Sequence, residues 1–421
     1  MADRASGGRR GLAAPVASTL RVVEHYLAEV TARGVRWHAS GKSVWRHEPA
    51  AGAIGGAPMS RWADDPERAA SDLLERCLDA IDVRGRVLLA NQAYHPPAGL
   101  AGRGLAGRNL PRRCPAGRGL EVAHWNRRLV GPPASYRGSG KAAPWPPAGP
   151  FEVVLLRLPK AKDEQEMAAH ACLSVLAADG QLVVYGGNAE GIRSAASMLD
   201  GLCGAVATLA KRGHGRVLAV ARPAKSDRLR SSLSAWRSTA SLEIGGQRRP
   251  WISYPGVFAA GRVDEGTALL IGALPPFGAG ARVLDYGCGS GLVGAAVLHQ
   301  SCATRLDALD SDSVALEAAR QNLPSAHCVL GTSLGQVGAT RYDAILSNPP
   351  LHQGMVEDHT LLQHLIAAAP AHLRAGGLLQ IVVQRRVPLE RWLAQHFAKV
   401  AISAETGRYR VWRAQVEAEQ P

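Results

Sequence analysis

The sequence lacks the features that place a chain in a membrane or outside the cell. No run of about 18 consecutive apolar residues, the length that crosses a bilayer as a helix, occurs in its 421 residues. The first residues, Met1 to Arg4, do not lead into an apolar stretch with a cleavage site, so no secretory signal is indicated. We therefore expect a cytoplasmic protein without a membrane segment.

Cysteines are few and irregularly spaced. The chain has seven of them, an odd number, and none belongs to a C-x-x-C pair. This pattern argues against a disulfide framework and against a zinc site. We expect no bound metal, and we interpret each cysteine as a small core residue or an isolated surface thiol.

Acidic residues are scarce in the first part of the chain. Residues 1–250 contain 36 Lys and Arg against 21 Asp and Glu, a net charge of +15, whereas residues 251–421 contain 13 against 14, a net charge of −1. A basic part joined to a neutral part predicts that one holds a polyanion while the other carries the chemistry. Genomic base composition is an alternative source of an Arg-, Ala- and Gly-rich sequence.

The length predicts two domains, because single cores stop growing near about 250–300 residues. We place a partly disordered N-terminal extension at 1–80, a first domain at 81–225, a linker at 226–250 and a second domain at 251–421. The linker is placed where charges are frequent, apolar periodicity is weak and prolines follow.

Residues 96–150 are rich in glycine and proline and are interpreted as loop. Between positions 103 and 141 this stretch has nine Lys and Arg, including Arg112 and Arg113, against one acid, and Trp125 and Tyr136 are interleaved with them. Arginines with aromatics on loops suit single-stranded RNA, which is held by phosphate contacts and base stacking. Arg112 and Arg113 are therefore candidate substrate contacts, and a solvated basic loop without a ligand is the alternative.

One strand–helix–strand pattern occurs twice. Residues 151–159 (FEVVLLRLP) can be aligned with residues 342–350 (YDAILSNPP), and in both copies a helical stretch, a glycine turn and an apolar strand follow. The repeat predicts two related α/β domains in tandem. When Pro159 is placed opposite Pro349, Leu158 stands where the second copy has Asn348, so we interpret the first copy as one that has lost its site. Coincidence between two common units is the alternative.

A short apolar strand, a glycine-rich loop and a helix follow one another in residues 282–301. Glycines let the chain turn tightly and let a nucleotide-like ligand approach the backbone amides without a Cβ in the way. A second strand ends in an acid 19 residues after the last glycine of the loop, the interval at which an acid usually meets ribose hydroxyls. The candidate cofactor residues are Asp285, Gly287, Gly289, Gly291 and Asp310.

The next motif separates two interpretations of this loop. Residues 289–294 also fit G-x-G-x-x-G, so a dinucleotide-dependent oxidoreductase is a rival. However, the segment that follows the strand at 342–346 reads Asn348, Pro349, Pro350, Leu351. Two prolines fix the backbone after the asparagine, and an amide oxygen with a nearby carbonyl can accept both hydrogens of an NH₂ group and so orient its lone pair. We take these four residues as the catalytic candidates for amine methylation.

These motifs resemble the class I S-adenosylmethionine-dependent methyltransferases, and specifically the RsmC/RlmG family of ribosomal RNA guanine-N2 methyltransferases. The resemblance covers the whole second domain, and two weaker segments extend it into the first. It rests on PGVFAAGRVDEGTALL (255–270), VLDYGCGSG (283–291), DAILSNPPLHQG (343–354), TGRYRVWRA (406–414), LPKAK (158–162) and GGNAEGIRSA (186–195).

The resemblance implies a fold of two tandem Rossmann-like domains, the N-terminal one degenerate and the C-terminal one with an intact cofactor site. It further implies S-adenosyl-L-methionine in the glycine loop, its ribose on Asp310, and a guanine amine of 16S ribosomal RNA at Asn348 and Pro349. Ribosomal RNA or the small ribosomal subunit is the expected partner, the first domain is expected to help bind it, and we expect a monomer.

Three further residues are assigned from the resembling segments. Asp264 belongs to the segment that resembles a cover over the cofactor, although capping a helix is an equally good interpretation. Phe258 and His352 are candidate substrate contacts. The family usually has Phe where this chain has Leu351, so Phe258 is expected to supply the aromatic contact to the base.

Two alternative functions stay open. The enzyme could act on another amine or amide, such as a 23S ribosomal RNA guanine, adenine N6 or a protein glutamine. Glutamine methyltransferases usually continue the motif with Tyr, whereas this chain has Leu351 and His352. The other alternative is an RNA-binding protein without activity, which suits the first domain but not the intact motifs of the second.

Overall fold

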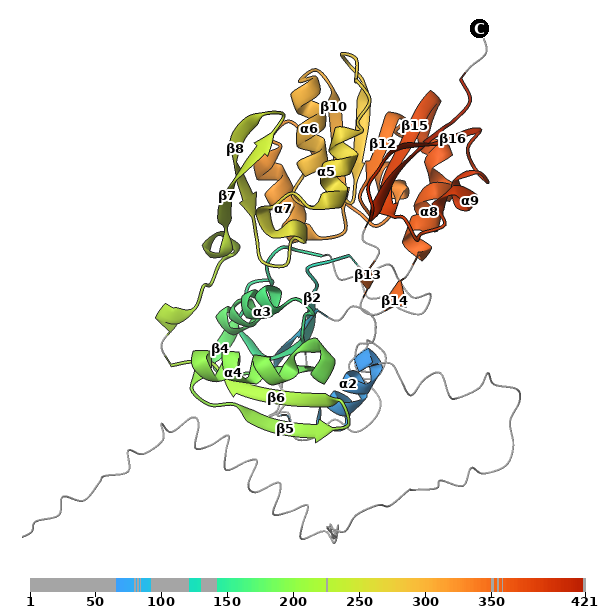
Figure 1. Ribbon diagram of the computed structural model, residues 1–421. Coiled ribbons are helices and arrows are strands. Elements are labelled where there is room, and N and C mark those ends of the chain that lie inside the picture. Colours follow the sequence, from blue (N-terminus) through green and yellow to red (C-terminus); the bar gives the residue numbers. More distant parts are fainter. Residues whose placement is uncertain are drawn as a thin grey trace, which may run out of the picture.

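The computed structural model describes two α/β domains, stacked one above the other in Figure 1. The described residues are 66–78, 81, 83, 85–91, 121–129, 142–224, 226–349, 352–353, 356–357 and 359–418. Among them, no helix is long and apolar enough to cross a membrane. The tandem α/β architecture predicted from the sequence is confirmed.

The first domain is a mostly parallel sheet with helices on both faces. It comprises α2 (Pro66–Glu75), β1 (Arg86–Ala90), β2 (Glu121–Trp125), β3 (Phe151–Arg157), α3 (Lys162–Ser174), β4 (Leu176–Gly187), α4 (Ile192–Cys203), β5 (Ala207–Arg212) and β6 (Gly215–Ala221). The strand order is β2-β1-β3-β4-β6-β5 among the described residues, and β6 and β5 are antiparallel to their neighbours. Helices α3 and α4 cover one face, while α2, which the sequence placed in the N-terminal extension, packs on the other.

The second domain has the same plan with one more described strand at its edge. It comprises α5 (Glu265–Gly272), β9 (Arg282–Tyr286), α6 (Leu292–Gln300), β10 (Arg305–Asp310), α7 (Ser313–Asn322), β11 (His327–Leu330), β12 (Tyr342–Ser347), β13 (His352–Gln353), β14 (Val356–Glu357), α8 (Thr360–Ala368), β15 (Leu373–Gln384), α9 (Leu389–Leu393), β16 (Lys399–Glu405) and β17 (Tyr409–Gln415). The order of the large sheet is β11-β10-β9-β12-β15-β17-β16. Helices α5 and α6 cover one face, and α8 and α9 cover the other.

The internal repeat predicted from the sequence is confirmed in the strand pairing. The order β2-β1-β3-β4-β6-β5 matches β10-β9-β12-β15-β17-β16, and the pairs β3–β4 and β12–β15 carry the same register shift near their first residues. The two glycine turns make this shift possible. A Cβ on Gly180 would lie 2.9 Å from the Phe151 carbonyl oxygen, and one on Gly377 would lie 3.1 Å from the Tyr342 carbonyl oxygen.

The carboxyl edge of the first sheet is closed by its own side chains. Arg157, at the end of β3, forms an ion pair of 2.6 Å with Glu190, and both side chains are nearly buried. The strand register matches Phe151 with Tyr342, so Arg157, and not Leu158 as the sequence comparison had it, is the counterpart of Asn348. Leu158 is also buried. The interpretation that the first copy has lost its site agrees with this closed edge.

Residues 226–250, expected to be a linker, contain more structure than the sequence indicated. They include β7 (Ser238–Ile244) and the start of β8 (Gln247–Ser253), an antiparallel hairpin that packs on the second domain. Along β7 only alternate residues near its end are buried, so its apolar signal is short. Trp251 of β8 donates a hydrogen bond from Nε1 to the Ser290 hydroxyl at 3.0 Å and thereby ties the hairpin to the glycine loop.

Both domains contribute to the region at the carboxyl ends of β10 and β12. The chain leaving β2 reaches the residues after β10, where the Leu129 N–H donates to the Ser311 carbonyl oxygen at 2.8 Å. Figure 1 shows β13 and β14, which follow β12, between the two domains. A site at this edge of the second sheet is therefore bordered by the first domain.

The glycine turns provide a test of the duplicated architecture. We expect Gly180→Ala and Gly377→Ala each to lower the free energy of unfolding by about 1–3 kcal/mol, because the added methyl group meets backbone atoms that cannot move aside easily. Gly201→Ala is the control, since nothing described lies within 4 Å of its Cβ position and alanine favours the helix interior by about 1 kcal/mol. Urea unfolding curves measure all three, and unchanged stability of both turn variants would contradict the role given to the turns.

Candidate active site

The glycine loop after β9 is shaped to leave its backbone open. Gly287, Gly289 and Gly291 have φ angles of 72°, 54° and 93°, a region that residues with a Cβ rarely adopt. A Cβ on Gly291 would lie 2.5 Å from Leu323, whereas nothing described lies within 4 Å of the Cβ position of Gly289. The loop is thus packed against the protein at Gly291 and exposes backbone at Gly289, as a ligand-binding turn requires.

Two carboxylates flank the loop. Asp285 accepts a hydrogen bond at 3.0 Å from the N–H of Gly294, in the first turn of α6. Asp310 accepts one at 2.8 Å from the N–H of Gly289 and another at 2.8 Å from the N–H of Asp312. The acid that the sequence placed on the ribose is therefore bonded directly to the glycine loop.

Burial dominates the electrostatics of both acids. It raises the pKa of Asp285 to about 7, although the hydrogen bond from Gly294 opposes the rise. Burial, followed by repulsion from Asp312, raises the pKa of Asp310 to about 6, against the N–H bonds from Asp312 and Gly289 and the charge of Arg128. Further hydrogen-bond donors would stabilise the ionised form of both carboxylates, because an ionised carboxylate has about four lone-pair sites.

The site fits a ribose-bearing cofactor. Each oxygen of Asp310 has one backbone donor, so lone pairs remain for two hydroxyl groups, and the carboxylate stays partly accessible to solvent. Gly289 leaves space beside it. The free acceptor sites of Asp310 and the open backbone at Gly289 together match what a nucleoside moiety needs.

Asn348 lies directly after β12, and its side chain is held by α5. The amide Nδ2 donates to the Thr267 hydroxyl at 2.9 Å and approaches Asp264 Oδ1 at 3.5 Å. The Thr267 hydroxyl in turn donates to Asp264 Oδ2. Because the NH₂ branch is bound in this way, the oxygen branch of the amide is left as the acceptor. Asn348 is half-buried and Pro349 is buried.

Asp264 has the helix-capping geometry that the sequence offered as one of two interpretations. Its Oδ1 accepts hydrogen bonds from the N–H groups of Gly266 and Thr267 at 3.0 and 3.2 Å. The same carboxylate orients Thr267, and through it Asn348. Asp264 is therefore placed beside the catalytic candidate Asn348.

Sequence reasoning missed two residues of this arrangement. Thr267 supplies the acceptor for Asn348, and Ser347, fully buried, donates from its hydroxyl to the Tyr286 carbonyl oxygen at 2.8 Å. The second bond ties the end of β12 to the end of β9, next to the glycine loop. The only sequence signal for Thr267 was its place within the segment 255–270.

Phe258 and His352 are the other candidates that lie among the described residues. Phe258 lies in the short helical turn η7 (Phe258–Gly261) and is 64% exposed, the largest exposed fraction among the large apolar side chains described. The next residue, Ala259, has a φ of 62°, a costly conformation outside glycine. For His352 only the backbone, in β13, is described. Four candidates lie outside the described residues: Arg112, Arg113, Pro350 and Leu351.

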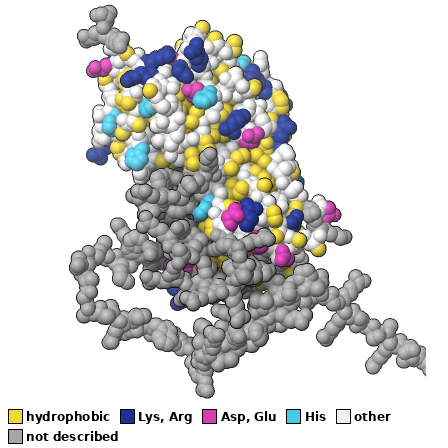
Figure 2. Space-filling view, turned by 180° about the vertical axis from the view of Figure 1, so that it is seen from behind, with side chains coloured by type: hydrophobic (Ala, Val, Ile, Leu, Met, Phe, Trp, Pro, Cys, Tyr) yellow, Lys and Arg dark blue, Asp and Glu magenta, His cyan; other side chains and the backbone are white. Residues whose placement is uncertain are grey.

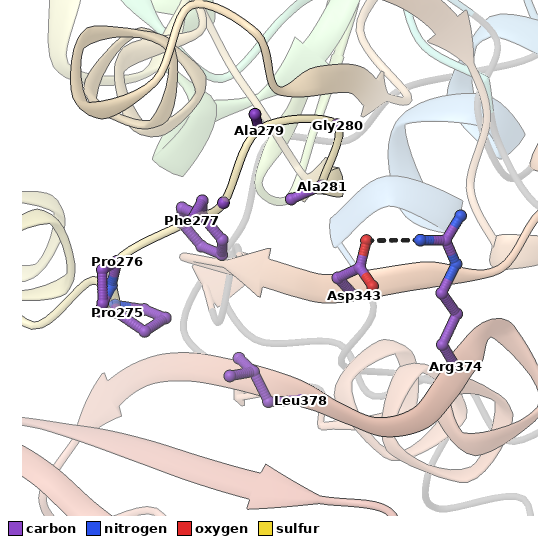
Figure 3. A pocket seen from close by; sticks show the side chains of 10 residues that line it. Pro275, Pro276, Phe277, Ala279, Gly280, Ala281, Asp343, Arg374 and Leu378 are labelled. Atoms are coloured by element: carbon purple, nitrogen blue, oxygen red, sulfur yellow. Dashed lines mark hydrogen bonds and ion pairs between the residues drawn. The ribbon is translucent and has the colours of Figure 1, made fainter.

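A hollow of about 410 Å³ lies at the opposite edge of the second sheet (Figure 3). It is lined by residues 275–281 and by Asp343, Arg374 and Leu378. Asp343 and Arg374 form an ion pair of 2.8 Å there, and Asp343 also accepts from the N–H of Arg282 at 2.7 Å. This hollow is at the amino ends of β9 and β12, whereas ligands of open α/β sheets bind at the carboxyl ends. It is not part of the candidate active site.

Comparison with known proteins finds matches for both domains. A family model described as "Methyltransferase small domain" matches residues 250–413, and one described as "Methyltransferase small domain N-terminal" matches residues 139–225. Within the solved structures, the fold is similar to that of "T. Thermophilus 16S rRNA N2 G1207 methyltransferase (RsmC) in complex with AdoMet and Guanosine". That match has a TM-score of 0.68 and 22% identity and covers 86% of this chain and 94% of the other.

Several curated relatives share the name "Ribosomal RNA small subunit methyltransferase C". The chain is 31% identical over 338 residues to the protein from Pseudomonas fluorescens. This alignment covers 79% of this chain and 99% of the relative. It is 30% identical over 266 residues to the protein from Shewanella halifaxensis, covering 62% of this chain and 76% of the relative. Since identity of this level extends over nearly the whole length of a relative, the chain belongs to the ribosomal RNA small subunit methyltransferase C family and is a methyltransferase.

Proposed function

We propose that this enzyme transfers a methyl group from S-adenosyl-L-methionine to the N2 amine of a guanine in 16S ribosomal RNA. The observation that carries the proposal is the amide of Asn348, oriented by Thr267 and Asp264 at the carboxyl edge of the sheet that also holds the glycine loop. The names of the relatives and of the similar solved structure support the same substrate class.

The cofactor-binding residues are those of the glycine loop and its two acids. Asp310 would accept the ribose hydroxyls, and the open backbone at Gly289 would lie against the nucleoside. Asp285 fixes the first turn of α6 through Gly294 and thereby the shape of the loop. When bound, the cofactor supplies an electrophilic methyl group on a sulfonium.

Asn348 orients the acceptor amine. Its Oδ1 and the carbonyl oxygen of Pro349 accept the two N–H groups of the guanine amine, so that the nitrogen lone pair points at the methyl group. The nitrogen would gain a bond to the methyl carbon as the carbon–sulfur bond breaks, leaving S-adenosylhomocysteine, and its surplus proton would leave to solvent after transfer. No general base is required, because the protein contributes orientation rather than basicity. A flipped guanine also needs a stacking partner, and the exposed ring of Phe258 is suited to this role.

The second domain has its own basic surface beside the site, in spite of its net charge near zero. Four arginines lie where β15 ends and β17 begins, and the Arg385 N–H donates to the Arg408 carbonyl oxygen at 2.9 Å. Arg408 is 70% exposed and pairs at 3.5 Å with Glu265, the neighbour of Asp264. We call this surface the arginine rim; its residues are Arg385, Arg386, Arg408 and Arg410.

The position of the arginine rim, rather than its charge alone, suggests an RNA contact. Lys and Arg side chains are also spread over the rear face of the second domain (Figure 2), so basic residues by themselves do not mark the site. The rim adjoins the N-terminus of α5, whose first turn holds Asn348. It is therefore placed to bind phosphates that flank the target base, in addition to the basic first part of the chain.

Ribosomal RNA as substrate implies a cytoplasmic enzyme, and one chain supplies both domains that border the site, so a monomer suffices. The alternatives differ in product. Methyl transfer to adenine would give N6-methyladenosine, transfer to protein would give methylglutamine, and the proposed reaction gives N2-methylguanosine. Mass spectrometry of nucleosides and peptides after incubation with ribosomal subunits separates the three.

Cofactor choice can be tested by titration. S-adenosylhomocysteine should bind, and Asp310→Ala should weaken it through the loss of hydrogen bonds to a charged acceptor, each contributing about 1.5–3 kcal/mol. Since burial raises the pKa of Asp310 to about 6, affinity should fall as the pH is lowered through that value and the carboxylate is protonated. Isothermal titration calorimetry measures both effects, with Asp343→Asn at the opposite edge as control. Binding of NADH in place of S-adenosylhomocysteine would refute the assignment.

Catalysis can be tested at Asn348 and Thr267. Asn348→Ala should lower kcat by about 100-fold or more with little change in cofactor affinity, because misplacement of a reacting group costs that much. Thr267→Val removes the hydroxyl that orients the amide and should lower kcat less, whereas Thr267→Ser should restore it. Methyl transfer to ribosomal RNA in single-turnover assays is the measurement. Unchanged turnover in Asn348→Ala would show that this residue only shapes the turn and does not orient the amine.

RNA binding by the arginine rim can be tested through its salt dependence. Arg385→Ala combined with Arg408→Ala should weaken binding of a ribosomal RNA fragment and lower the slope of log K against log salt by about 0.7–0.9 for each phosphate that the variant no longer neutralises. Arg374→Ala is the matched control, because this arginine is 48% exposed and ion-paired but lies at the opposite edge. Equal slopes for the rim variant, the control and the unaltered enzyme would exclude the rim from the RNA surface.

A further inference from the structure

The chain after β2 connects the first domain to the cofactor side of the second. Beyond Trp125, residues 127–129 run alongside residues 311–313, which follow β10. The Leu129 N–H donates to the Ser311 carbonyl oxygen at 2.8 Å, and the Ser313 N–H and hydroxyl donate to the Arg127 carbonyl oxygen at 3.1 and 2.6 Å. This short pairing adds a segment of one domain to a loop of the other.

Arg127 lies at the centre of this contact. It is 4% exposed, and its Nε donates to both oxygens of Asp312, at 2.8 and 2.9 Å. Its Nη1 donates to the carbonyl oxygen of Pro255 at 2.6 Å. A buried arginine with these partners requires its acid, because removal of either partner leaves an uncompensated buried charge.

Arg128 completes a four-residue charge network. It donates to both oxygens of Glu164, at 2.6 and 2.9 Å, and lies 3.1 Å from Asp312. Glu164 comes from the first turn of α3, so the first domain supplies two arginines and one acid while the second supplies Asp312. The two arginines hold the pKa of Asp312 below its usual range, although burial alone would raise it.

Asp312 is joined to the ribose acid. Its N–H donates to Asp310 Oδ1 at 2.8 Å, and its side chain caps α7 by accepting from the N–H groups of Val314 and Ala315. Asp310 Oδ2 in turn accepts from Gly289. A continuous series of hydrogen bonds therefore runs from Arg127 through Asp312 and Asp310 to the glycine loop.

We propose that the first domain completes the cofactor site: Arg127 and Arg128 act as positioning residues that hold Asp312, and through its backbone N–H hold Asp310, in the geometry that binds the cofactor ribose. This deepens the proposed function and rests on it. The domain that has lost its own cofactor site thus contributes to that of its partner.

The electrostatics agree with this geometry. The charged groups acting on Asp310 are Asp312, which repels it, and Arg128, which attracts it, and Asp285, Tyr286 and Cys288 lie close enough to be influenced by it. The charge of Arg128 offsets part of the repulsion that Asp312 exerts on Asp310. Without the arginines, two adjacent carboxylates would face each other in a buried site.

The test is cofactor affinity in the full chain. Arg127→Met should raise the Kd for S-adenosylhomocysteine about tenfold or more, within the range of about 5–150-fold that couplings between sites usually show. Arg157→Met is the matched control, because it breaks an ion pair of 2.6 Å that is also nearly buried but lies within the first domain. Circular dichroism and thermal unfolding without ligand establish that each variant is folded.

Arg128→Met provides a second, milder variant, since this side chain is 40% exposed. Loss of its charge removes an influence that lowers the pKa of Asp310, so the acid limb of cofactor binding should move to higher pH. The pH profile should not move in Arg157→Met. This readout also decides the matter if Arg127→Met does not fold, because a structural defect alone would change affinity without shifting the limb.

If the domain interface strengthens cofactor binding, cofactor binding must strengthen the interface in turn. Saturating S-adenosylhomocysteine should slow hydrogen exchange of the Leu129 amide, which is bonded across the interface. If the unaltered enzyme binds the ligand but Arg127→Met and Arg128→Met bind it as tightly, with unshifted pH profiles, this inference is wrong and the proposed function stands. If the unaltered enzyme does not bind the ligand, the proposed function itself fails.

Discussion

The carboxylate of Asp310 is the group on which the organisation of this molecule depends. One oxygen accepts from the glycine loop at Gly289 and the other from Asp312, whose side chain is ion-paired to Arg127 of the first domain. A carboxylate at this depth is costly to ionise, as its raised pKa of about 6 indicates, and each bond to it reduces that cost. The loop, the sheet edge and the domain interface are therefore held together around one half-buried carboxylate.

The two domains share a plan but use the carboxyl edge of the sheet differently. Both have the same strand order and the same glycine turn. In the first, the edge is closed by the pair Arg157–Glu190 and by the buried Leu158, so its polar groups satisfy one another. In the second, Asn348 and Asp310 keep acceptor oxygens available. In the first domain, Arg127 and Arg128 instead bind Asp312 of the partner domain.

Much of the fold was predictable because parallel strands buried on both faces are apolar runs bounded by glycine, a strong local signal. The strand at 86–90, which follows Gly85, and the strand at 282–286, which precedes Gly287, obey this rule. The hairpin at 238–253 was missed, since only alternate residues of β7 near its end are buried and most of the others are polar or charged. Helix α2 was assigned to an extension because its apolar face finds its partner sheet only in three dimensions.

The sequence by itself determined the glycine loop, the acid at the end of β10 and the Asn-Pro-Pro segment, because tight turns and proline-fixed backbone are local requirements that particular residue types meet. It did not determine which groups orient them. Thr267 and Asp264 lie 81 and 84 residues from Asn348, and Arg127 lies 185 residues from Asp312. Hydrogen bonds and ion pairs act over a few ångströms irrespective of sequence distance. Only the tertiary structure could therefore decide which arginine neutralises the acid beside the cofactor site.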